Sequence, residues 1–355
     1  MSAPLRLLRL DGDGIGPEIM AAAMAALDGV RPRLTRAVQV EPMKIGFAAL
    51  QATGSTIPDA VIDAARAADG VLLGPVSHNA YPPREEGGLN PSGVLRGALE
   101  LFANIRPARA WGGVPAPSQT PIDLVVVREN LEGFYADRNM VSGPGEVMPV
   151  PGVALATRKI TEAASRRIAE AAFALASTRP ARKVTAVHKA NVMRLSDGLF
   201  LDVVREVAGG FPDVAYDEML VDAAAAMLVR DAARFDVIVT TNMFGDILSD
   251  LASELAGGLG LAGSLNRGPA HVAAQAQHGS APDIAGRDSA NPVSMILSLA
   301  MLLDHFRETD AASAIRDAVA RCLASAGTRT VDLGGRASTS AFCEAMAERL
   351  QEDIA

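Results

Sequence analysis

The feature that most restricts the fold of this chain is the run of β-branched and apolar residues from Phe235 to Thr240. A continuous apolar run of this kind is typical of a strand that a sheet buries on both faces, as in α/β proteins. The segment TTNMFGDILSD follows at once and predicts a helix that begins near Asp246. Open α/β sheets bind ligands beyond the carboxyl ends of their strands, so this helix start is a candidate site.

Two acids of that segment, Asp246 and Asp250, are four residues apart. On a helix this spacing places both carboxylates on one face, one turn apart. Two carboxylates at this separation repel each other and are best tolerated around a cation, and hard oxygen ligands suit Mg²⁺ or Mn²⁺. The alternative is an ordinary helix cap followed by an acid in the first turn.

Strand and helix patterns alternate along the rest of the chain, which indicates a mixed α/β fold. At 355 residues the chain is long enough for two domains. Strands are expected at 5–10, 71–73, 122–127 and 183–187. Helices are expected at 57–68, 92–102, 161–177, 199–207, 223–229, 292–306, 311–324 and 338–351.

Composition excludes several classes of function. The net charge is −8 and no cluster of Lys and Arg occurs, so nucleic acid is not an expected partner. No long uncharged apolar run is present, so no membrane span is expected. The two cysteines, Cys322 and Cys343, lie in predicted helices and suggest a reducing compartment. With no signal peptide at the start, the sequence predicts a cytoplasmic protein.

Two glycine-containing segments are candidate ligand loops. Gly12, Gly14 and Gly16 alternate after the first strand, so the spacing of a dinucleotide fingerprint fails. That turn either approaches a ligand or only joins strand to helix. The second segment, Gly74–Pro91, is a loop long enough to suggest a function.

Three arginines, Arg96, Arg106 and Arg128, lie near predicted strand or helix ends. Guanidinium groups bind carboxylates in a bidentate manner, so the three together indicate an acidic substrate with several negative charges. Lys189 and Tyr135 are candidate proton-transfer groups. Each of these two residue types, taken alone, is more commonly structural.

Eight motifs follow one another along the chain: GDGIGPE at 12–18, LR at 95–96, ANIRP at 103–107, VRENLEGFY at 127–135, HKAN at 188–191, VDAAAA at 221–226, TTNMFGDILSD at 240–250 and HGSAPDIAG at 278–286. No single motif is specific, but their order and spacing together are. With them the chain resembles, over nearly its whole length, the NAD(P)-dependent β-decarboxylating dehydrogenases that act on isopropylmalate, isocitrate, homoisocitrate and tartrate or malate.

This resemblance implies the family's own α/β sheet architecture and not a Rossmann fold. It implies a large, mainly cofactor-binding domain made of residues 1–100 and 252–355, with a small domain, residues 101–251, inserted between them. An arm at about residues 136–155 would join two subunits.

The resemblance also assigns roles to the candidate residues. Two acid–base roles follow, Lys189 as the base for the 2-hydroxyl proton and Tyr135 as the acid that protonates the enolate. The substrate carboxylates would be held by Arg96, Arg106 and Arg128, and Mg²⁺ or Mn²⁺ by Asp222, Asp246 and Asp250. Lys189 and Asp222 would come from the partner subunit, which implies a homodimer with shared active sites.

The cofactor preference follows from Asp283, whose carboxylate can accept hydrogen bonds from ribose hydroxyls and repels a 2′-phosphate. NADP-using relatives carry Lys-Tyr at the positions of Asp283 and Ile284, so NAD is predicted. The alternative is that Asp283 only ends a turn. The cofactor-binding residues implied by the resemblance are Ile15, His278, Gly279, Ala281, Asp283, Ile284 and Asn291.

The substrate is expected to be a 3-substituted (R)-malate, a hydroxy di- or tricarboxylate. Asn90 and Ser92 offer hydrogen bonds to a third carboxylate, which favours an isocitrate or homoisocitrate type. Gly93 and Val94 leave apolar room that suits 3-isopropylmalate, and tartrate or D-malate are further alternatives. The loop Gly74–Pro91 matches no subfamily. A catalytically silent regulatory subunit is disfavoured because every metal and proton-transfer residue is retained.

Overall fold

The computed structural model describes residues 3–118, 120–135 and 145–352 and divides into two compact units. Unit 1 contains Met1–Leu99, Ala110–Ala116 and Gly257–Ala355. Unit 2 contains Glu100–Arg109 and Pro117–Ala256. Both chain termini therefore belong to unit 1, and the long central segment forms most of unit 2.

The strands of unit 1 lie in the order β2-β1-β3-β12-β11. Their bounds are β1 Leu5–Leu10, β2 Val38–Met43, β3 Gly70–Leu73, β11 Gly263–Arg267 and β12 Val272–Ala276. Neighbouring strands run parallel except β11, which pairs antiparallel with β12. The sheet therefore combines strands from the two ends of the chain.

Helix α9, Val293–His305, lies at the centre of unit 1 and is buried along most of its length. Its neighbours are β11, β12, α1 (Gly16–Val30) and α10 (Thr309–Ala324). Helix α11, Thr339–Glu352, packs against α1 and α10. An apolar surface on every side is what a helix in the middle of a core requires.

Three further helices of unit 1 are α2 (Phe47–Thr53), α3 (Asp59–Ala67) and α4 (Pro91–Ala98). The expected helix at 92–102 is therefore too long at its end, because Glu100 has a φ of 51° and the helical path stops before it.

The loop Gly74–Pro91 is tied to unit 1 near both of its ends. Buried Thr56 donates its hydroxyl to the Leu89 carbonyl at 2.6 Å and accepts from the Leu89 N–H at 2.8 Å. Buried Asp13 accepts from the Ser77 N–H at 2.9 Å and from the Tyr81 hydroxyl. These contacts give a long loop a defined path without regular secondary structure of any length.

The strands of unit 2 lie in the order β4-β5-β10-β8-β9. Only β4 is antiparallel to its neighbour. Their bounds are β4 Ala103–Arg109, β5 Asp123–Glu129, β8 Lys183–His188, β9 Ala215–Leu220 and β10 Val237–Thr240.

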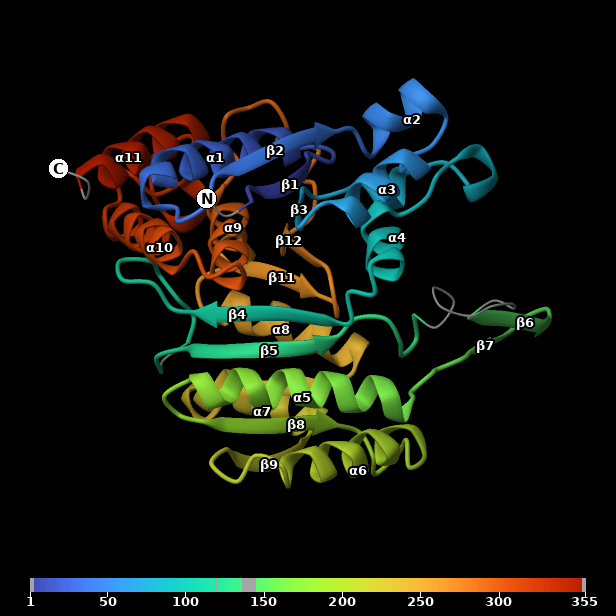
Figure 1. Ribbon diagram of the computed structural model, residues 1–355. Helices are drawn as coiled ribbons and strands as arrows, with labels where there is room; N and C mark the ends of the chain where they lie inside the picture. Colours follow the sequence, from blue (N-terminus) through green and yellow to red (C-terminus); the bar gives the residue numbers. More distant parts are fainter. Residues whose placement is uncertain (1–2, 119, 136–144, 353–355) are drawn as a thin grey trace. The chain divides into compact units, whose positions relative to one another are not determined.

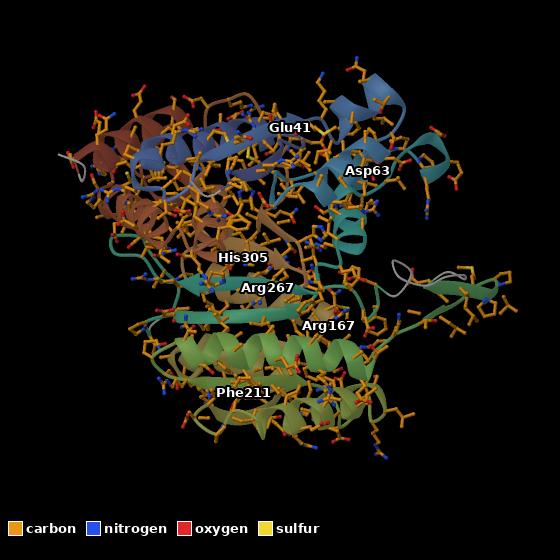
Figure 2. All side chains as sticks on the ribbon, in the orientation of Figure 1. Glu41, Asp63, Arg167, Phe211, Arg267 and His305 are labelled. Atoms are coloured by element: carbon orange, nitrogen blue, oxygen red, sulfur yellow. The ribbon has the colours of Figure 1, made fainter. Side chains whose placement is uncertain are left out.

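Both faces of this sheet are covered by helices. Helices α5 (Glu162–Thr178) and α6 (Ser196–Ala208) share one core cluster with alternate strand residues. Helices α7 (Val221–Asp231) and α8 (Asn242–Leu255) share the other. The first core includes Phe173, whose ring stacks on that of Phe211 at a centroid distance of 5.4 Å. Phe211 is labelled in Figure 2. Burial on both faces explains why β10 is apolar at every position.

A two-stranded hairpin of β6 (Glu146–Val150) and β7 (Val153–Ala156) projects from unit 2 (Figure 1). Every residue of both strands is exposed, including Met148 and Leu155. An isolated hairpin is marginally stable in water, so exposed apolar residues on both strands are typical of a segment that another surface covers. Residues 136–144 of the expected arm lie outside the described residues.

Helix α8 begins one turn earlier than the sequence pattern suggests. Thr241 is its N-cap residue and Asn242 its first residue, so Asp246 lies in the second turn. The interpretation of Asp246 as a helix cap is therefore wrong, and capping does not explain the acid pair. Separately, no helix in the described part of the chain is long and apolar enough to cross a membrane.

Candidate active site

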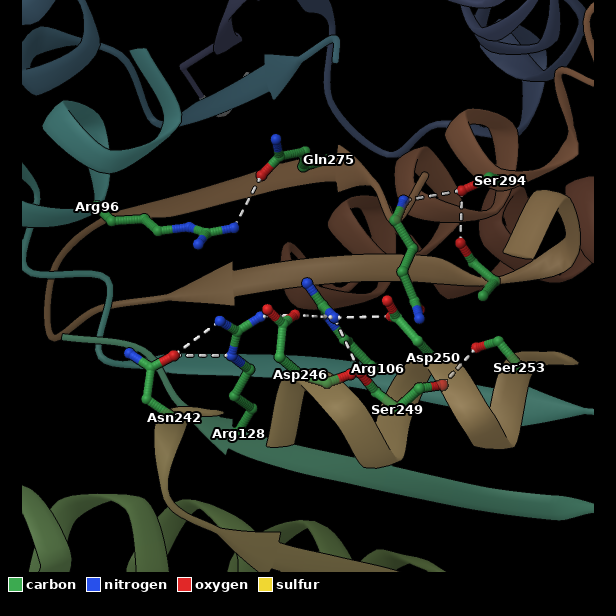
Figure 3. A network of polar contacts seen from close by, with 12 residues as sticks. Arg96, Arg106, Arg128, Asn242, Asp246, Ser249, Asp250, Ser253, Gln275 and Ser294 are labelled. Carbon is green, nitrogen blue, oxygen red and sulfur yellow. Dashed lines mark hydrogen bonds and ion pairs between the residues drawn. The ribbon is translucent and has the colours of Figure 1, made fainter. Parts of the chain in front are cut away.

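The main polar network of unit 2 joins two arginines to helix α8 (Figure 3). Arg106 comes from β4 and Arg128 from β5. Arg106 Nη1 donates to Asp246 Oδ1 at 3.0 Å, to Asp250 Oδ1 at 3.3 Å and to Ser249 Oγ at 2.8 Å. Arg128 Nη1 pairs with the same oxygen of Asp246. The network thus brings together four of the residues that the sequence singled out, and it adds Ser249.

The two sides of this network differ in exposure. The arginine side chains are only 7% (Arg106) and 3% (Arg128) exposed, whereas Asp246 is 37% and Asp250 49% exposed. Burial, and then the neighbouring Arg106 charge, lower the pKa of Arg128 to about 10, against the opposing effect of Asp246. Two buried guanidinium groups side by side need anions, and the acids that supply them face outward.

Two residues of the same motif hold Arg128 in place. Asn242 Oδ1 accepts from Arg128 Nε at 3.0 Å and from Nη2 at 2.7 Å. Its amide nitrogen donates to the Glu132 carbonyl at 3.1 Å. At Gly245, an added Cβ would lie 2.6 Å from Arg128 Cγ and 2.7 Å from its Cβ. The motif therefore carries Gly at this position because helix α8 passes directly over the arginine.

The third expected metal ligand lies elsewhere. Asp222 Oδ1 accepts from Lys189 Nζ at 2.6 Å, and the Lys189 ammonium lowers the pKa of the Asp222 carboxyl below its usual value. Among the described residues, no three acids, histidines or cysteines form a group able to hold a metal ion. One chain therefore joins Asp246 with Asp250 but not with Asp222. Carboxylate oxygens one helical turn apart still fit a hard divalent cation whose remaining ligands come from elsewhere.

Buried acids position the two candidate proton-transfer residues. The Lys189 N–H donates to Asp197 Oδ2 at 2.5 Å, and fully buried Asp197 also pairs with Arg158 at 2.5 Å. Half-buried Tyr135 has its ring centroid 6.0 Å from the Arg128 guanidinium carbon.

The turn that leads to Tyr135 is held by two more acids. Glu132 accepts from the Thr161 N–H at 2.9 Å and from its hydroxyl at 2.8 Å. Glu129 accepts from the N–H groups of Leu131 and Glu132, while burial raises the pKa of its carboxyl to about 7.

Unit 1 contains a cavity of about 270 Å³. A cavity of this size holds part of a dinucleotide and not the whole. Its lining includes six of the seven predicted cofactor-binding residues and three that sequence reasoning missed. The six are Ile15, His278, Gly279, Ala281, Ile284 and Asn291, and the three are Gly260, Ser289 and Asp332.

The chemistry of this cavity fits a nucleotide. The Nε2 atom of His278 is buried without a hydrogen-bond partner among the described residues, and burial lowers the pKa of its imidazole. Asn291 Nδ2 donates to Asp332 Oδ2 at 2.9 Å, which fixes the amide at the wall. Asp283, the remaining predicted cofactor residue, is exposed and does not line the cavity.

The glycine turn after β1 supports the same cavity. The Ile15 N–H donates to the Ser280 carbonyl at 2.9 Å. At Gly14, with a φ of +58°, an added Cβ would lie 1.9 Å from that carbonyl oxygen. Ala281 also has a positive φ of 37°, a strain that clusters at ligand sites. The turn therefore holds the loop that lines the cavity, which a simple strand-to-helix connection would not require.

The predicted substrate residues of α4 are linked through Gln275 at the end of β12. Arg96 Nη2 donates to Gln275 Oε1 at 3.4 Å (Figure 3). Gln275 Nε2 donates in turn to Ser92 Oγ at 2.7 Å. Asn90 is the N-cap of α4, and its amide oxygen accepts from the Gly93 N–H at 3.2 Å. Sequence reasoning missed Gln275, for which no motif provides a signal.

Comparison with known proteins identifies what this arrangement resembles. The family model described as isocitrate/isopropylmalate dehydrogenase matches residues 6–350. The 3-isopropylmalate dehydrogenase of Archaeoglobus fulgidus is 42% identical over 345 residues, covering 97% of this chain and 99% of the relative. The isocitrate/homoisocitrate dehydrogenase of Thermus thermophilus is 42% identical over 348 residues, covering 98% of each.

The crystal structure of isocitrate dehydrogenase from Methylococcus capsulatus has a TM-score of 0.89 and 38% identity, covering 98% of this chain and 99% of that one. The predicted fold is thereby confirmed. Equal identity to relatives with different substrates means that overall similarity does not choose between those substrates.

The close approach at Gly245 generates a prediction. Gly245→Ala should lower the free energy of unfolding by about 1–3 kcal/mol, because the new methyl group overlaps Arg128. Chemical denaturation measures this change. The matched control is Gly97→Ala, in a helix with open space around the glycine, which should raise stability by about 0.4–1 kcal/mol. Equal effects of the two substitutions would contradict the packing argument.

Proposed function

The chain belongs to the isocitrate/isopropylmalate dehydrogenase family, and from this premise we propose that it catalyses oxidative decarboxylation of a 3-substituted (R)-malate with NAD and Mg²⁺ or Mn²⁺. Enzymes of this family are NAD(P)-dependent β-decarboxylating dehydrogenases that use a divalent metal and act on hydroxy acid carboxylates. The chain is therefore an enzyme of that class. The choice of NAD, the substrate and the residue roles are the proposal.

The observation that carries the proposal is the interlocked set of Arg106, Arg128, Asp246 and Asp250. An anionic substrate supplies carboxylates to the buried guanidinium groups. The half-exposed acids are then available to a cation. In this site the aspartates pair with the arginines. Such a site suits a carboxylate ligand that chelates a metal ion, because the ligand carboxylate can bind the arginines while the metal ion binds the aspartates.

In the proposed reaction, Lys189 accepts the 2-hydroxyl proton, and NAD, when bound, would take up the hydride from C2. The resulting β-keto acid loses CO₂, which leaves an enolate, and Tyr135 donates a proton to its carbon. Arg96, Arg106 and Arg128 hold the carboxylates in register. Asp246 and Asp250, with Asp222 of a second subunit, would hold the divalent cation, which when bound would supply Lewis acidity to the substrate.

Two observations bear on the substrate. The hydroxyl group of Ser92 is buried and is linked to Arg96 through Gln275, which favours the isocitrate or homoisocitrate type. The 3-isopropylmalate dehydrogenase relative, at equal identity, makes isopropylmalate the second candidate. Tartrate and D-malate, which carry smaller groups at C3, leave the buried polar group unused.

The proposed assembly is a homodimer with shared active sites. Exposed apolar residues occur on the β6–β7 hairpin and around α6, where Leu195 is 90% exposed. Asp222 does not join Asp246 and Asp250 within the described residues of one chain. We propose residues 1–100 and 252–355 as the cofactor-binding domain and 101–251 as the domain that forms the dimer. The cytoplasmic location stays a prediction.

The reaction and its metal can be tested together. With Mn²⁺ present, the protein should form NADH from one of isocitrate, homoisocitrate, isopropylmalate, malate or tartrate. Asp246→Asn and Asp250→Asn should each lose about a hundredfold or more in turnover, because charge compensation of the cation is lost. Thermal unfolding of each variant separates this loss from the destabilisation that a less well-paired buried arginine causes. Asp63→Asn, an exposed acid on α3, is the control that should keep its activity. Full activity of both site variants in excess Mg²⁺ would remove the metal assignment.

Cofactor preference should follow residue 283. Replacing Asp283-Ile284 with Lys-Tyr should lower kcat/KM for NAD and raise it for NADP, since a repulsion of the 2′-phosphate becomes an attraction. Steady-state kinetics with both cofactors measures the change. The exposed Asp317→Lys on α10 makes a comparable charge change away from the cavity and should leave the ratio unchanged. A wild-type preference for NADP would contradict the interpretation of this loop.

Shared sites predict complementation between inactive subunits. Lys189→Ala and Arg128→Ala are each expected to be inactive, but a heterodimer would contain one site with both lesions and one with neither. Mixing the two with subunit exchange should therefore restore part of the activity. Exchange demonstrated without any recovery would place Lys189 in the site of its own subunit.

A further inference from the structure

We propose that Gln275 is a positioning residue that makes Ser92 a hydrogen-bond donor toward the third carboxylate of a tricarboxylate substrate. The proposal rests on the proposed function and deepens it by naming the substrate class. Gln275 lies on β12, and Ser92 lies in the first turn of α4, 183 residues away in the sequence.

The direction of the two hydrogen bonds follows from the groups involved. A guanidinium has only donors, so Arg96 requires the amide oxygen of Gln275 to face it. The amide nitrogen of Gln275 must then point to Ser92, whose Oγ lies at 2.7 Å and can only accept from it. Arg96 thereby sets the orientation of the amide, and the amide sets the role of the hydroxyl.

A hydroxyl group that accepts from Gln275 still has its own proton to donate. Ser92 is only 7% exposed, and no second hydrogen-bond partner of its side chain occurs among the described residues. A buried donor without an acceptor is costly, so this position suits a ligand that brings one. A carboxylate at C3 of the substrate is such an acceptor, whereas an isopropyl group at C3 is not.

The uncharged amide is necessary for this role. A carboxylate at position 275 would accept hydrogen bonds both from Arg96 and from the Ser92 hydroxyl. Ser92 would then no longer donate a hydrogen bond to the ligand. Any change in the charge balance of Arg96 affects the malate carboxylates that all candidate substrates share. That effect therefore cancels in the ratio of kcat/KM for a tricarboxylate to kcat/KM for isopropylmalate. The direct repulsion between a carboxylate at position 275 and the third substrate carboxylate does not cancel, and the Ser92→Ala background measures it separately.

The experiment measures this ratio, with isocitrate and homoisocitrate as tricarboxylates, for the wild type, Gln275→Glu, Ser92→Ala and the double variant. Gln275→Glu should lower the ratio by about tenfold to a hundredfold, mainly through KM of the tricarboxylate, as expected for a lost hydrogen bond to a charged group. Ser92→Ala should lower it by a similar factor. Within the Ser92→Ala background, Gln275→Glu should lower the ratio by a clearly smaller factor, because only the direct repulsion between the new carboxylate and the third substrate carboxylate remains.

Thermal unfolding of each variant, with the exposed Gln39→Glu on β2 as a control, separates these effects from loss of fold. An unchanged ratio in Gln275→Glu, or an equal fall in both Ser92 backgrounds, would overturn the proposal. So would a wild-type preference for isopropylmalate, which leaves the proposed reaction class intact. No turnover of any of these substrates by the wild type would contradict the proposed function itself.

Discussion

The ion-pair network between two buried arginines and the acids of α8 is the constraint on which the rest of unit 2 depends. Arg106 and Arg128 are almost fully enclosed, and burial lowers the pKa of Arg128 to about 10. Only nearby anions make two such charges tolerable. Helix α8 can pass close to Arg128 because residue 245 is glycine, and the Asn242 amide oxygen accepts a hydrogen bond from the Arg128 guanidinium.

Both units hold candidate functional segments in the same physical way, with buried acids that accept hydrogen bonds from backbone N–H groups. Asp13 in unit 1 anchors the loop Gly74–Pro91, and Glu132 and Asp197 in unit 2 anchor the segments that carry Tyr135 and Lys189. A carboxylate that accepts several bonds fixes a loop at low entropic cost, because its partners are already ordered. The candidate catalytic groups therefore lie on supports that packing has made rigid.

Local pattern was sufficient for the most strongly apolar elements. The strand Leu5–Leu10 has the bounds that the sequence predicts, and the central helix α9 differs by a single residue at each end. The strands β2, β11 and β12 escaped prediction, because β2 contains Gln39, Glu41 and Pro42 and β12 is rich in alanine. Their strand conformation comes from neighbouring strands and not from residue preference.

The sequence by itself determined which residues are candidates for the site, because motif order and spacing single out the arginines, the α8 acids and the loop 278–286. The start of α8 was misplaced by a turn, since Thr241 caps the helix without a side-chain hydrogen bond. Only the tertiary structure decided that Gly260 and Asp332 line the cavity of unit 1 and that Gln275 joins Ser92 to Arg96. The physical reason is that hydrogen-bond direction and cavity shape depend on residues brought together from distant segments, which local pattern does not encode.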